Sequence, residues 1–288
     1  VKPRNEEKML TECGVVEEPD LATRVFGGRF ARPGQYPWMA LLNVGFLYSN
    51  KVETYRCGGS LISNRHVLTA AHCVREVRAK LNSVTIRLGV YNLVKHNPWE
   101  KIYDICLKDV IVHHQYDPKS LTGNDISVIR LPEQITFMEH IRPICLPFNN
   151  VMDNYEDEGL FVFAAGWGRT EPYSNGRLSD VLKVSNETLL SKRTCCEKIG
   201  VNYFNTDTEL CTTYNFHGGV TCQGDSGGPL MKIKGHTPYS TKAFVIGITA
   251  REPPSKSENP KRSCATGSPS IYTDVSAYLD WILEIIEE

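Results

Sequence analysis

Short apolar runs rich in β-branched residues follow one another from Val25 onward, and Gly, Pro, Asn and Asp gather between them. Many short runs separated by turn residues are typical of an all-β sandwich or barrel. The runs that we expect to form strands include Ser60–Ile62, Val84–Leu88, Asp109–Val112, Ile126–Leu131, Leu160–Ala164 and Ala243–Ile248.

Three segments depart from this pattern. Residues 1–24 are charged and hold Pro3 and Pro19, so we expect an irregular tail anchored by Cys13. Arg251–Ser263, rich in Pro, Ser, Lys and Glu, is expected to form an exposed loop. A C-terminal amphipathic helix over 275–286 is predicted because apolar residues recur there every three or four positions. They are Val275, Tyr278, Leu279, Ile282, Leu283 and Ile286.

The composition is that of a globular protein with a sizeable core: 288 residues, 41% hydrophobic and 23% charged. The 32 basic and 33 acidic residues are interleaved, which argues against nucleic acid or an anionic membrane as a partner. No apolar run approaches about 18 residues, so no transmembrane helix is expected. The first residues, VKPRNEEKML, lack an apolar signal core, and we interpret the chain as a fragment or processed form with its targeting segment upstream.

The ten cysteines are scattered along the chain, and no CxxC pair repeats at zinc-finger spacing. We therefore expect no structural metal and no cofactor, but a disulfide framework formed in an oxidising, extracellular compartment. The alternative is a cytosolic protein with buried thiols. Asn186-Glu187-Thr188 is a sequon, and we expect Asn186 to be glycosylated, although sequons are common by chance.

Three motifs together predict nucleophilic catalysis. Gly224-Asp225-Ser226-Gly227-Gly228-Pro229 offers a serine hydroxyl between glycines that permit a tight turn, and the amides of Gly224 and Ser226 could point together at an oxyanion. Thr69-Ala70-Ala71-His72-Cys73 offers the base that a weakly acidic hydroxyl needs. Asn124-Asp125-Ile126 offers a carboxylate to orient His72. Taken singly, each motif is also compatible with a structural role.

In the order His72, Asp125, Ser226, these motifs resemble the chymotrypsin-like, or trypsin-fold, serine endopeptidases. The resemblance extends over residues 25–288. It includes Arg24-Val25-Phe26-Gly27-Gly28, Pro37-Trp38, Cys57-Gly58-Gly59-Ser60-Leu61-Ile62, Gly166-Trp167-Gly168 and Ile271-Tyr272-Thr273. It implies two packed six-stranded antiparallel β-barrels, about 25–140 and 141–274, followed by the C-terminal helix.

The arrangement also resembles the arthropod clip-type cascade proteases, in which a light chain stays linked to the catalytic chain. Here the light chain would be residues 1–24, although they hold one cysteine and no full clip domain. The resemblance implies the disulfides Cys13–Cys145, Cys57–Cys73, Cys195–Cys211 and Cys222–Cys264. Cys106 and Cys196 remain, and they could pair with each other, join another chain or stay free.

The resemblance further implies that the chain is a secreted zymogen. Cleavage after Arg24 would free the amine of Val25, which would pair with Asp225 and order the oxyanion hole. The partners implied are a protein substrate, an upstream trypsin-like activating protease and, as a further candidate, a serpin-type inhibitor.

The residues expected to form the substrate pocket depart from the trypsin pattern. Val220, followed by Thr221, stands where trypsin-like members have an Asp, so an arginine guest would find no carboxylate. Ala250-Arg251-Glu252 replaces Ser-Trp-Gly, and Ser270 replaces a Gly. Glu252 could narrow the entrance or supply a negative charge. We expect cleavage after a small or medium uncharged residue.

Calcium is not expected, because Leu88-Gly89 is followed by Val90 and Glu100 alone does not make a site. The leading interpretation is an active endopeptidase. A catalytically weak, protease-like binding or regulatory protein is the alternative, which the departures at 250–252 favour and the complete set of three motifs opposes. A structural disulfide-rich module would explain the cysteines alone.

Overall fold

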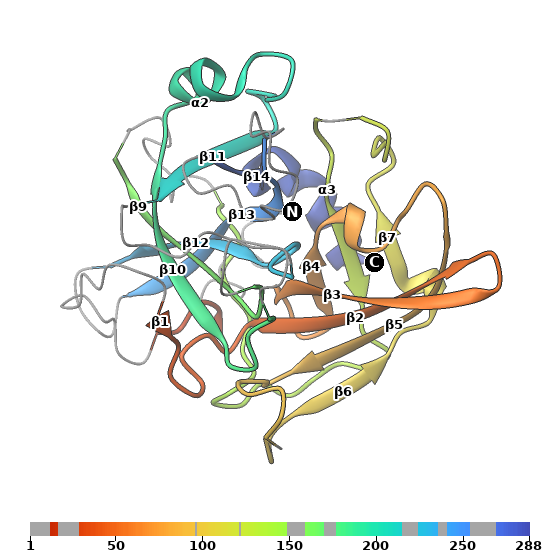
Figure 1. Ribbon diagram of the computed structural model, residues 1–288. Helices are drawn as coiled ribbons and strands as arrows, with labels where there is room; N and C mark the ends of the chain where they lie inside the picture. The colour runs from red at the N-terminus through yellow and green to blue at the C-terminus, as the bar shows by residue number, and fades with distance from the viewer. Residues whose placement is uncertain are drawn as a thin grey trace.

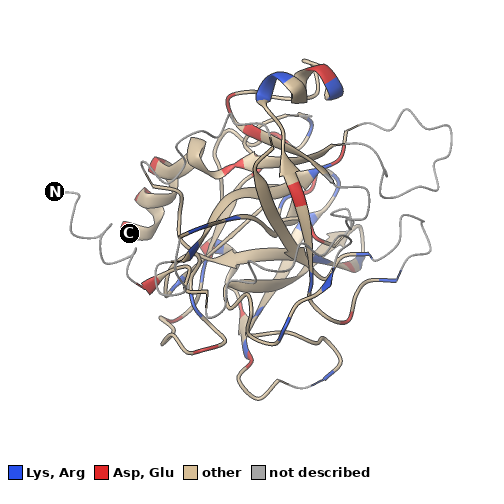
Figure 2. Cartoon of the chain, turned by 90° about the vertical axis from the view of Figure 1, so that its left-hand side faces the viewer, with Lys and Arg blue, Asp and Glu red and all other residues tan. Residues whose placement is uncertain are grey.

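The computed structural model describes residues 12–16, 29–95, 97–120, 122–148, 159–169, 177–214, 224–235, 241–253 and 269–288. Its strands form two antiparallel sheets that lie side by side (Figure 1). Basic and acidic residues are mixed along the chain drawn in Figure 2, as the interleaved sequence leads one to expect.

The first sheet comes from the N-terminal half of the chain and is curled, in the order β6-β5-β2-β3-β4-β8-β7. Its long hairpin, β2 and β3, pairs Met39 with Ser60 and continues to Tyr48 and Lys51. The strands are β2 (Met39–Tyr48), β3 (Lys51–Leu61), β4 (His66–Thr69), β5 (Lys80–Leu88), β6 (Lys101–Asp104), β7 (Val110–Val112) and β8 (Ser127–Arg130).

The second sheet has the order β1-β10-β11-β14-β13-β12-β9, and an added pairing of β9 with β10 closes six of its strands into a barrel. The two-residue strand β1 adds to the outside of β10. The strands are β1 (Arg29–Phe30), β9 (Phe161–Gly166), β10 (Lys183–Leu189), β11 (Glu209–Tyr214), β12 (Pro229–Lys234), β13 (Lys242–Arg251) and β14 (Ser270–Asp274).

The helices are short. Besides the 3-10 turns η1 (Ala71–Cys73) and η2 (Leu107–Asp109), the chain has α2 (Lys192–Ile199), and η3 (Val275–Tyr278) leads into α3 (Leu279–Glu287). The predicted C-terminal helix is therefore present, but its first turn is 3-10 and is capped by the Asp274 side chain. The described helices include none that is long and apolar enough to cross a membrane.

One core joins the two sheets. It includes Trp38 and Ile86 from the first half of the chain together with Val184 and Val245 from the second half. The Trp38 indole N–H points at the sulfur of Met231 on β12, at 3.1 Å. The prediction of two packed antiparallel β-barrels with a C-terminal helix is confirmed, with the first sheet curled and the second one closed.

The expected exposed loop at 251–263 is wrong at its first residue. Arg251 is the last residue of strand β13. It is half-buried rather than exposed, because its guanidinium is paired with Glu209. Residues 254–263 of that predicted loop lie outside the described residues.

Candidate active site

His72 and Asp125 are joined by two hydrogen bonds. The backbone N–H of His72 donates to Asp125 Oδ1 at 2.8 Å, and ring Nδ1 lies 2.7 Å from Oδ2. This geometry makes Nδ1 the protonated nitrogen and leaves Nε2 as the basic one, which is the tautomer that a general base needs.

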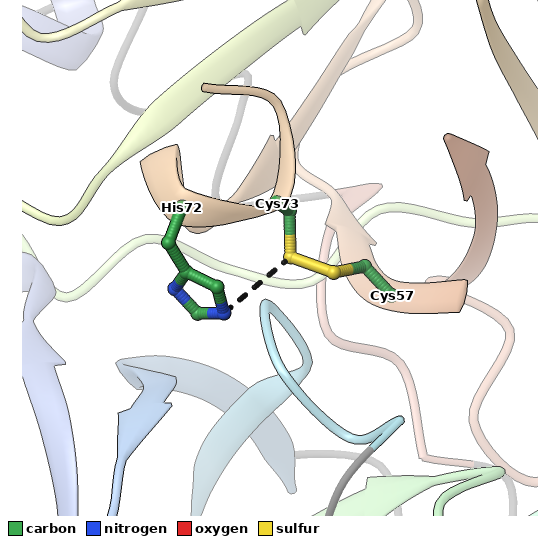
Figure 3. A group of neighbouring side chains, drawn as sticks. All are labelled: Cys57, His72 and Cys73. Atoms are coloured by element: carbon green, nitrogen blue, oxygen red, sulfur yellow. Dashed lines mark hydrogen bonds between the residues drawn. A yellow bond between two sulfur atoms is a disulfide. The ribbon is translucent and has the colours of Figure 1, made fainter. Parts of the chain in front are cut away.

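The local chain explains why His72 is presented. The apolar strand β4 ends at Thr69, and the turn η1 follows with buried Ala71 and Cys73 on either side of the histidine. Figure 3 shows the disulfide from Cys73 to Cys57, which ties this turn to strand β3. Asp125 lies two residues before β8, the strand that pairs with β4, and directly before buried Ile126.

Ser226 lies where the two sheets meet. Its carbonyl accepts the N–H of Gly58 on β3 at 2.7 Å, and the next N–H, of Gly227, donates to Thr249 on β13 at 2.8 Å. Gly227 has φ +80°, and an added Cβ would lie 2.2 Å from Thr69 Oγ1 and 3.2 Å from the Ala70 nitrogen. A glycine is therefore required here, and the serine turn packs against the segment that leads to His72.

The structure brings these motifs together. Among the described residues, however, Ser226 and His72 do not form a hydrogen bond. The contact recorded for His72 Nε2 is with Cys73 Sγ at 3.9 Å (Figure 3). Hydrogen bonds between a catalytic base and its nucleophile are often long without substrate.

Gly224 and Asp225 complete the turn. Gly224 has φ +101°, and an added Cβ would lie 2.9 Å from Leu178 Cδ2, so no other residue fits without strain. Asp225 accepts the backbone N–H of Gly168 at 2.7 Å. The carboxylate lies so close to Gly166 and Gly168 that a Cβ at either glycine would collide with it.

The electrostatic environment of His72 has opposing parts. Burial of the imidazole favours its neutral form, but the charge of Asp125 and its hydrogen bond outweigh burial, so the pKa of His72 is raised. The nearby Arg251 acts in the opposite sense and lowers that pKa. The site thus contains a paired, oriented imidazole beside a serine held by glycines.

Comparison with known families decides the identity. The trypsin family model matches residues 25–282, which include all three motifs. The chain belongs to the trypsin family. This trypsin-family chain is a serine endopeptidase, and the resemblance found in its sequence is confirmed.

The curated relatives of this trypsin-family chain include arthropod enzymes. The chain is 36% identical to "Venom serine protease Bi-VSP" of Bombus ignitus, over 90% of this chain and 67% of the relative. It is 33% identical to "CLIP domain-containing serine protease B4" of Anopheles gambiae, over 95% and 72%. It is 34% identical to "Spaetzle-processing enzyme" of Drosophila melanogaster, over 96% and 68%.

Three of the four expected disulfides are present: Cys13–Cys145, Cys57–Cys73 and Cys195–Cys211. Both cysteines of the fourth, Cys222–Cys264, lie outside the described residues. Cys106 is exposed and Cys196 half-buried, and both are free thiols. The expected sequon residue Asn186 lies on β10, half-buried and paired with Phe163 of β9.

Several predicted site residues cannot be placed. Arg24, Val25, Val220 and Thr221 lie outside the described residues. Of the other expected pocket residues, Ala250 is buried on β13 and Ser270 is buried on β14, where it pairs with Thr212, while Glu252 is half-buried.

The one group of side chains with metal-like spacing in the described part of the chain is Cys57, His72 and Cys73. Its two sulfurs are joined in a disulfide and offer no thiolate, so the group cannot act as a metal site (Figure 3). Glu100, the one carboxylate weighed for calcium, is instead paired with the Arg87 guanidinium.

Sequence reasoning missed the polar contacts around Asp125. Asn124 has a left-handed φ of 56°, and Tyr278 of η3 fixes it by accepting its N–H and donating to its side chain. None of the sequence motifs includes Glu209, whose buried carboxylate binds Arg251. An Asn before the aspartate was the available signal for the left-handed residue.

Proposed function

We propose that the chain is the catalytic part of a secreted protease that is made as a zymogen and acts in an extracellular proteolytic cascade. The observation that carries the proposal is the double hydrogen bond from His72 to Asp125 beside the glycine-bounded Ser226. These are the three residue types that acyl-enzyme hydrolysis requires, and the hydrogen-bonded His72–Asp125 pair supports the proposed roles.

In this mechanism Ser226 Oγ attacks the carbonyl carbon of the scissile peptide while His72 Nε2 takes its proton. The same nitrogen then gives the proton to the leaving amine, and a water repeats the cycle to release the acid product. Asp125 holds the imidazole and stabilises its protonated form. The amides of Gly224 and Ser226 stabilise the oxyanion, for which the positive φ of Gly224 is a supporting feature.

Activation would follow cleavage between Arg24 and Val25. The new amine of Val25 would pair with Asp225, whose carboxylate is held close to Gly166 and Gly168 next to the nucleophile. Either charge buried alone would be costly, so the pair forms only after cleavage.

The test is Arg24→Gln, with Arg4→Gln in the same tail as the matched control. Treatment with trypsin should activate the parent chain and the control but leave Arg24→Gln with almost no activity towards peptide esters. Equal activation of all three proteins would contradict the proposed switch.

The cascade role rests on the relatives. Their names include "Proclotting enzyme" of Tachypleus tridentatus and "Spaetzle-processing enzyme" of Drosophila melanogaster, at 32% and 34% identity. Such a role implies a protein substrate, an upstream activating protease and a serpin-type inhibitor. It also implies secretion, for which glycosylation of Asn186 is a direct test: a glycosidase should reduce the mass of the peptide that contains Asn186.

For the substrate, we propose a small or medium uncharged residue before the scissile bond. The replacement of the usual Asp by Val220 supports this preference, together with buried Ala250 and Ser270 in the predicted pocket wall. Such an enzyme would not readily cut after its own Arg24. A peptide-library profile dominated by arginine before the cleaved bond would contradict the preference.

A protease-like binding protein is the second candidate. The unusual residues at 250–252 favour it, whereas the paired His72 and Asp125 oppose it. A fluorophosphonate probe discriminates the two, because it reacts covalently only with an activated serine.

A further inference from the structure

A partly buried ion pair lies close to the candidate active site. Arg251 Nη1 lies 2.6 Å from Glu209 Oε1, and Nη2 lies 3.0 Å from Oε2, so the guanidinium binds the carboxylate through two parallel hydrogen bonds. The Glu209 side chain is 2% exposed and that of Arg251 is 25% exposed. Bidentate pairs of this kind combine strength with a fixed orientation.

The Glu209 carboxylate also holds two loops. Oε1 accepts the N–H of Gly123 at 3.0 Å, and Oε2 accepts the N–H of Asn205 at 2.9 Å. Four hydrogen bonds therefore converge on one carboxylate, which fills its acceptor positions. Because Gly123 lies two residues before Asp125, the ion pair reaches the candidate triad through the backbone.

The loop that carries Asp125 is in turn held at each of its residues. Gly123 is held by Glu209, Asn124 by the Tyr278 hydroxyl, and the Asp125 carbonyl by the Thr273 hydroxyl at 2.9 Å. Gly123 and Asn124 both have positive φ, at 83° and 56°. A glycine adopts such a φ freely, but Asn124 keeps it only when its surroundings fix it; Tyr278 holds Asn124 directly, and Glu209 holds the residue before it.

The guanidinium also acts on His72 through space. The charged groups that shift the pKa of His72 are Asp125, which raises it, and Arg251, which lowers it. Arg251 is anchored by the Tyr203 carbonyl at 2.9 Å as well as by Glu209, so its charge is held in place.

We propose that Arg251 and Glu209 are positioning residues for peptide hydrolysis, which fix the Gly123–Asp125 loop and set a positive charge near His72. The proposal rests on the proposed protease mechanism. The ion pair has two separable effects. It keeps Asp125 in line with His72 Nδ1, and its positive charge limits how far Asp125 raises the basicity of the imidazole.

The experiment compares four variants of the activated full chain by kcat/KM against pH. Arg251→Gln removes the charge but keeps an amide that can bind Glu209. We expect the acidic limb of the pH profile, where kcat/KM falls as His72 is protonated, to move to higher pH. We also expect kcat to fall about tenfold. Arg251→Lys restores the charge but not the two-pronged contact, so the limb should return towards its original position while part of the kcat loss remains.

Glu209→Gln leaves the guanidinium uncompensated, and we expect the acidic limb to move to lower pH, opposite to Arg251→Gln. Arg193→Ala breaks the exposed ion pair with Glu197 on α2 and is the matched control, for which no change is expected. A uniform loss of activity with unchanged limbs in both Arg251 variants would reduce the pair to a structural role and overturn the proposal.

A measurement that needs no catalysis separates this proposal from the proposed function. NMR titration of the His72 imidazole in the folded protein should give a higher pKa in Arg251→Gln than in the parent and a near-parent pKa in Arg251→Lys. An unmoved pKa overturns the positioning role even in an inactive protein, whereas an inactive parent whose His72 responds as expected counts against the proposed function alone. Thermal melts confirm that each variant is folded.

Discussion

Asp125 binds His72 at two points, the backbone N–H at 2.8 Å and ring Nδ1 at 2.7 Å, so one carboxylate fixes both the position of the turn and the direction of the ring. The backbone contact keeps η1 in place while the ring contact selects the tautomer. The two functions can be separated by substitution, because an amide can still accept the backbone N–H.

The first prediction concerns Asp125→Asn. The amide can keep the contact with the backbone but no longer stabilises the Nδ1–H tautomer or the protonated ring. We expect kcat to fall about ten-thousandfold with little change in KM, which is the loss known for the chymotrypsin-like prototype of this triad. Steady-state kinetics on a peptide ester measure it. Asp109→Asn, at the end of η2, is the control, and a loss below about tenfold would remove Asp125 from the mechanism.

The second prediction concerns pH. A general base works in its neutral form, and the pKa of His72 is raised above its usual 6.5 by Asp125. We therefore expect the acidic limb of kcat/KM to lie above pH 6.5.

The same raised pKa stabilises the folded state below the unfolded value of 6.5, and this contribution is lost as the pH rises through the folded value. Denaturation in urea across this range, with Asp125→Asn as the comparison, measures it. A limb well below pH 6.5 in the activated chain would contradict the assignment of His72 as the base.

The third prediction concerns the link between the tail and the catalytic part. Residues 12–16 are held by the Cys13–Cys145 disulfide and by hydrogen bonds of Gly14 with Pro143 and Ala243. After cleavage at Arg24, the tail should remain attached on a non-reducing gel and leave on reduction. The double variant Cys13→Ser, Cys145→Ser should lose the tail without reduction, whereas Cys106→Ser, which alters a free thiol, should keep it. A tail retained by the double variant under denaturing conditions would contradict the prediction.

The fourth prediction concerns stability. Glu187 is buried inside the closed barrel and accepts hydrogen bonds from the hydroxyls of Ser185, Thr212 and Tyr272. Glu187→Ala removes the buried acceptor that these three hydroxyls share, and we expect a loss of about 3 kcal/mol in the free energy of unfolding. Glu197→Ala, on an exposed side chain, is the control and should change stability by less than about 0.5 kcal/mol.

Glu187 also allows a test of the direction in which stability changes with pH. Burial raises its pKa above 4.5, against the three hydroxyl contacts, so ionisation opposes folding. Its share of the stability is present at low pH and is lost as the pH rises from the unfolded value of 4.5 to the raised folded value. Glu187→Gln should therefore flatten the fall of stability with pH in that range. An unchanged pH profile would contradict the raised pKa.

The sequence was informative where local chemistry and position coincide. The apolar run that ends at Thr69 is a strand, so His72 lies just beyond the end of that strand. The glycines around Ser226 indicate a turn that needs positive φ. The sequence was uninformative about pairs that only folding brings together. The local sequence predicts Arg251 to be the first residue of a polar loop. Its partner Glu209 is 42 positions away, so nothing near Arg251 in the sequence indicates the ion pair.

Glu187 shows a second limit of sequence reasoning. Nothing in the sequence around Glu187 indicates that it is buried. In the structure β10 turns this side chain into the barrel, where the register with β9 and β11 decides which side chains meet. A strand's pattern gives alternation but not the identity of its neighbours. For the same reason, Thr212 and Tyr272 could not be recognised as its donors.

The most direct test of the account is to label the trypsin-activated chain with a fluorophosphonate and locate the adduct by peptide mass spectrometry. The account predicts one adduct on Ser226, which is lost in His72→Ala and absent from the chain before activation. An activated, folded chain that leaves Ser226 unlabelled, or that is labelled equally without His72, would contradict the claim that these residues act together as a nucleophile and its base.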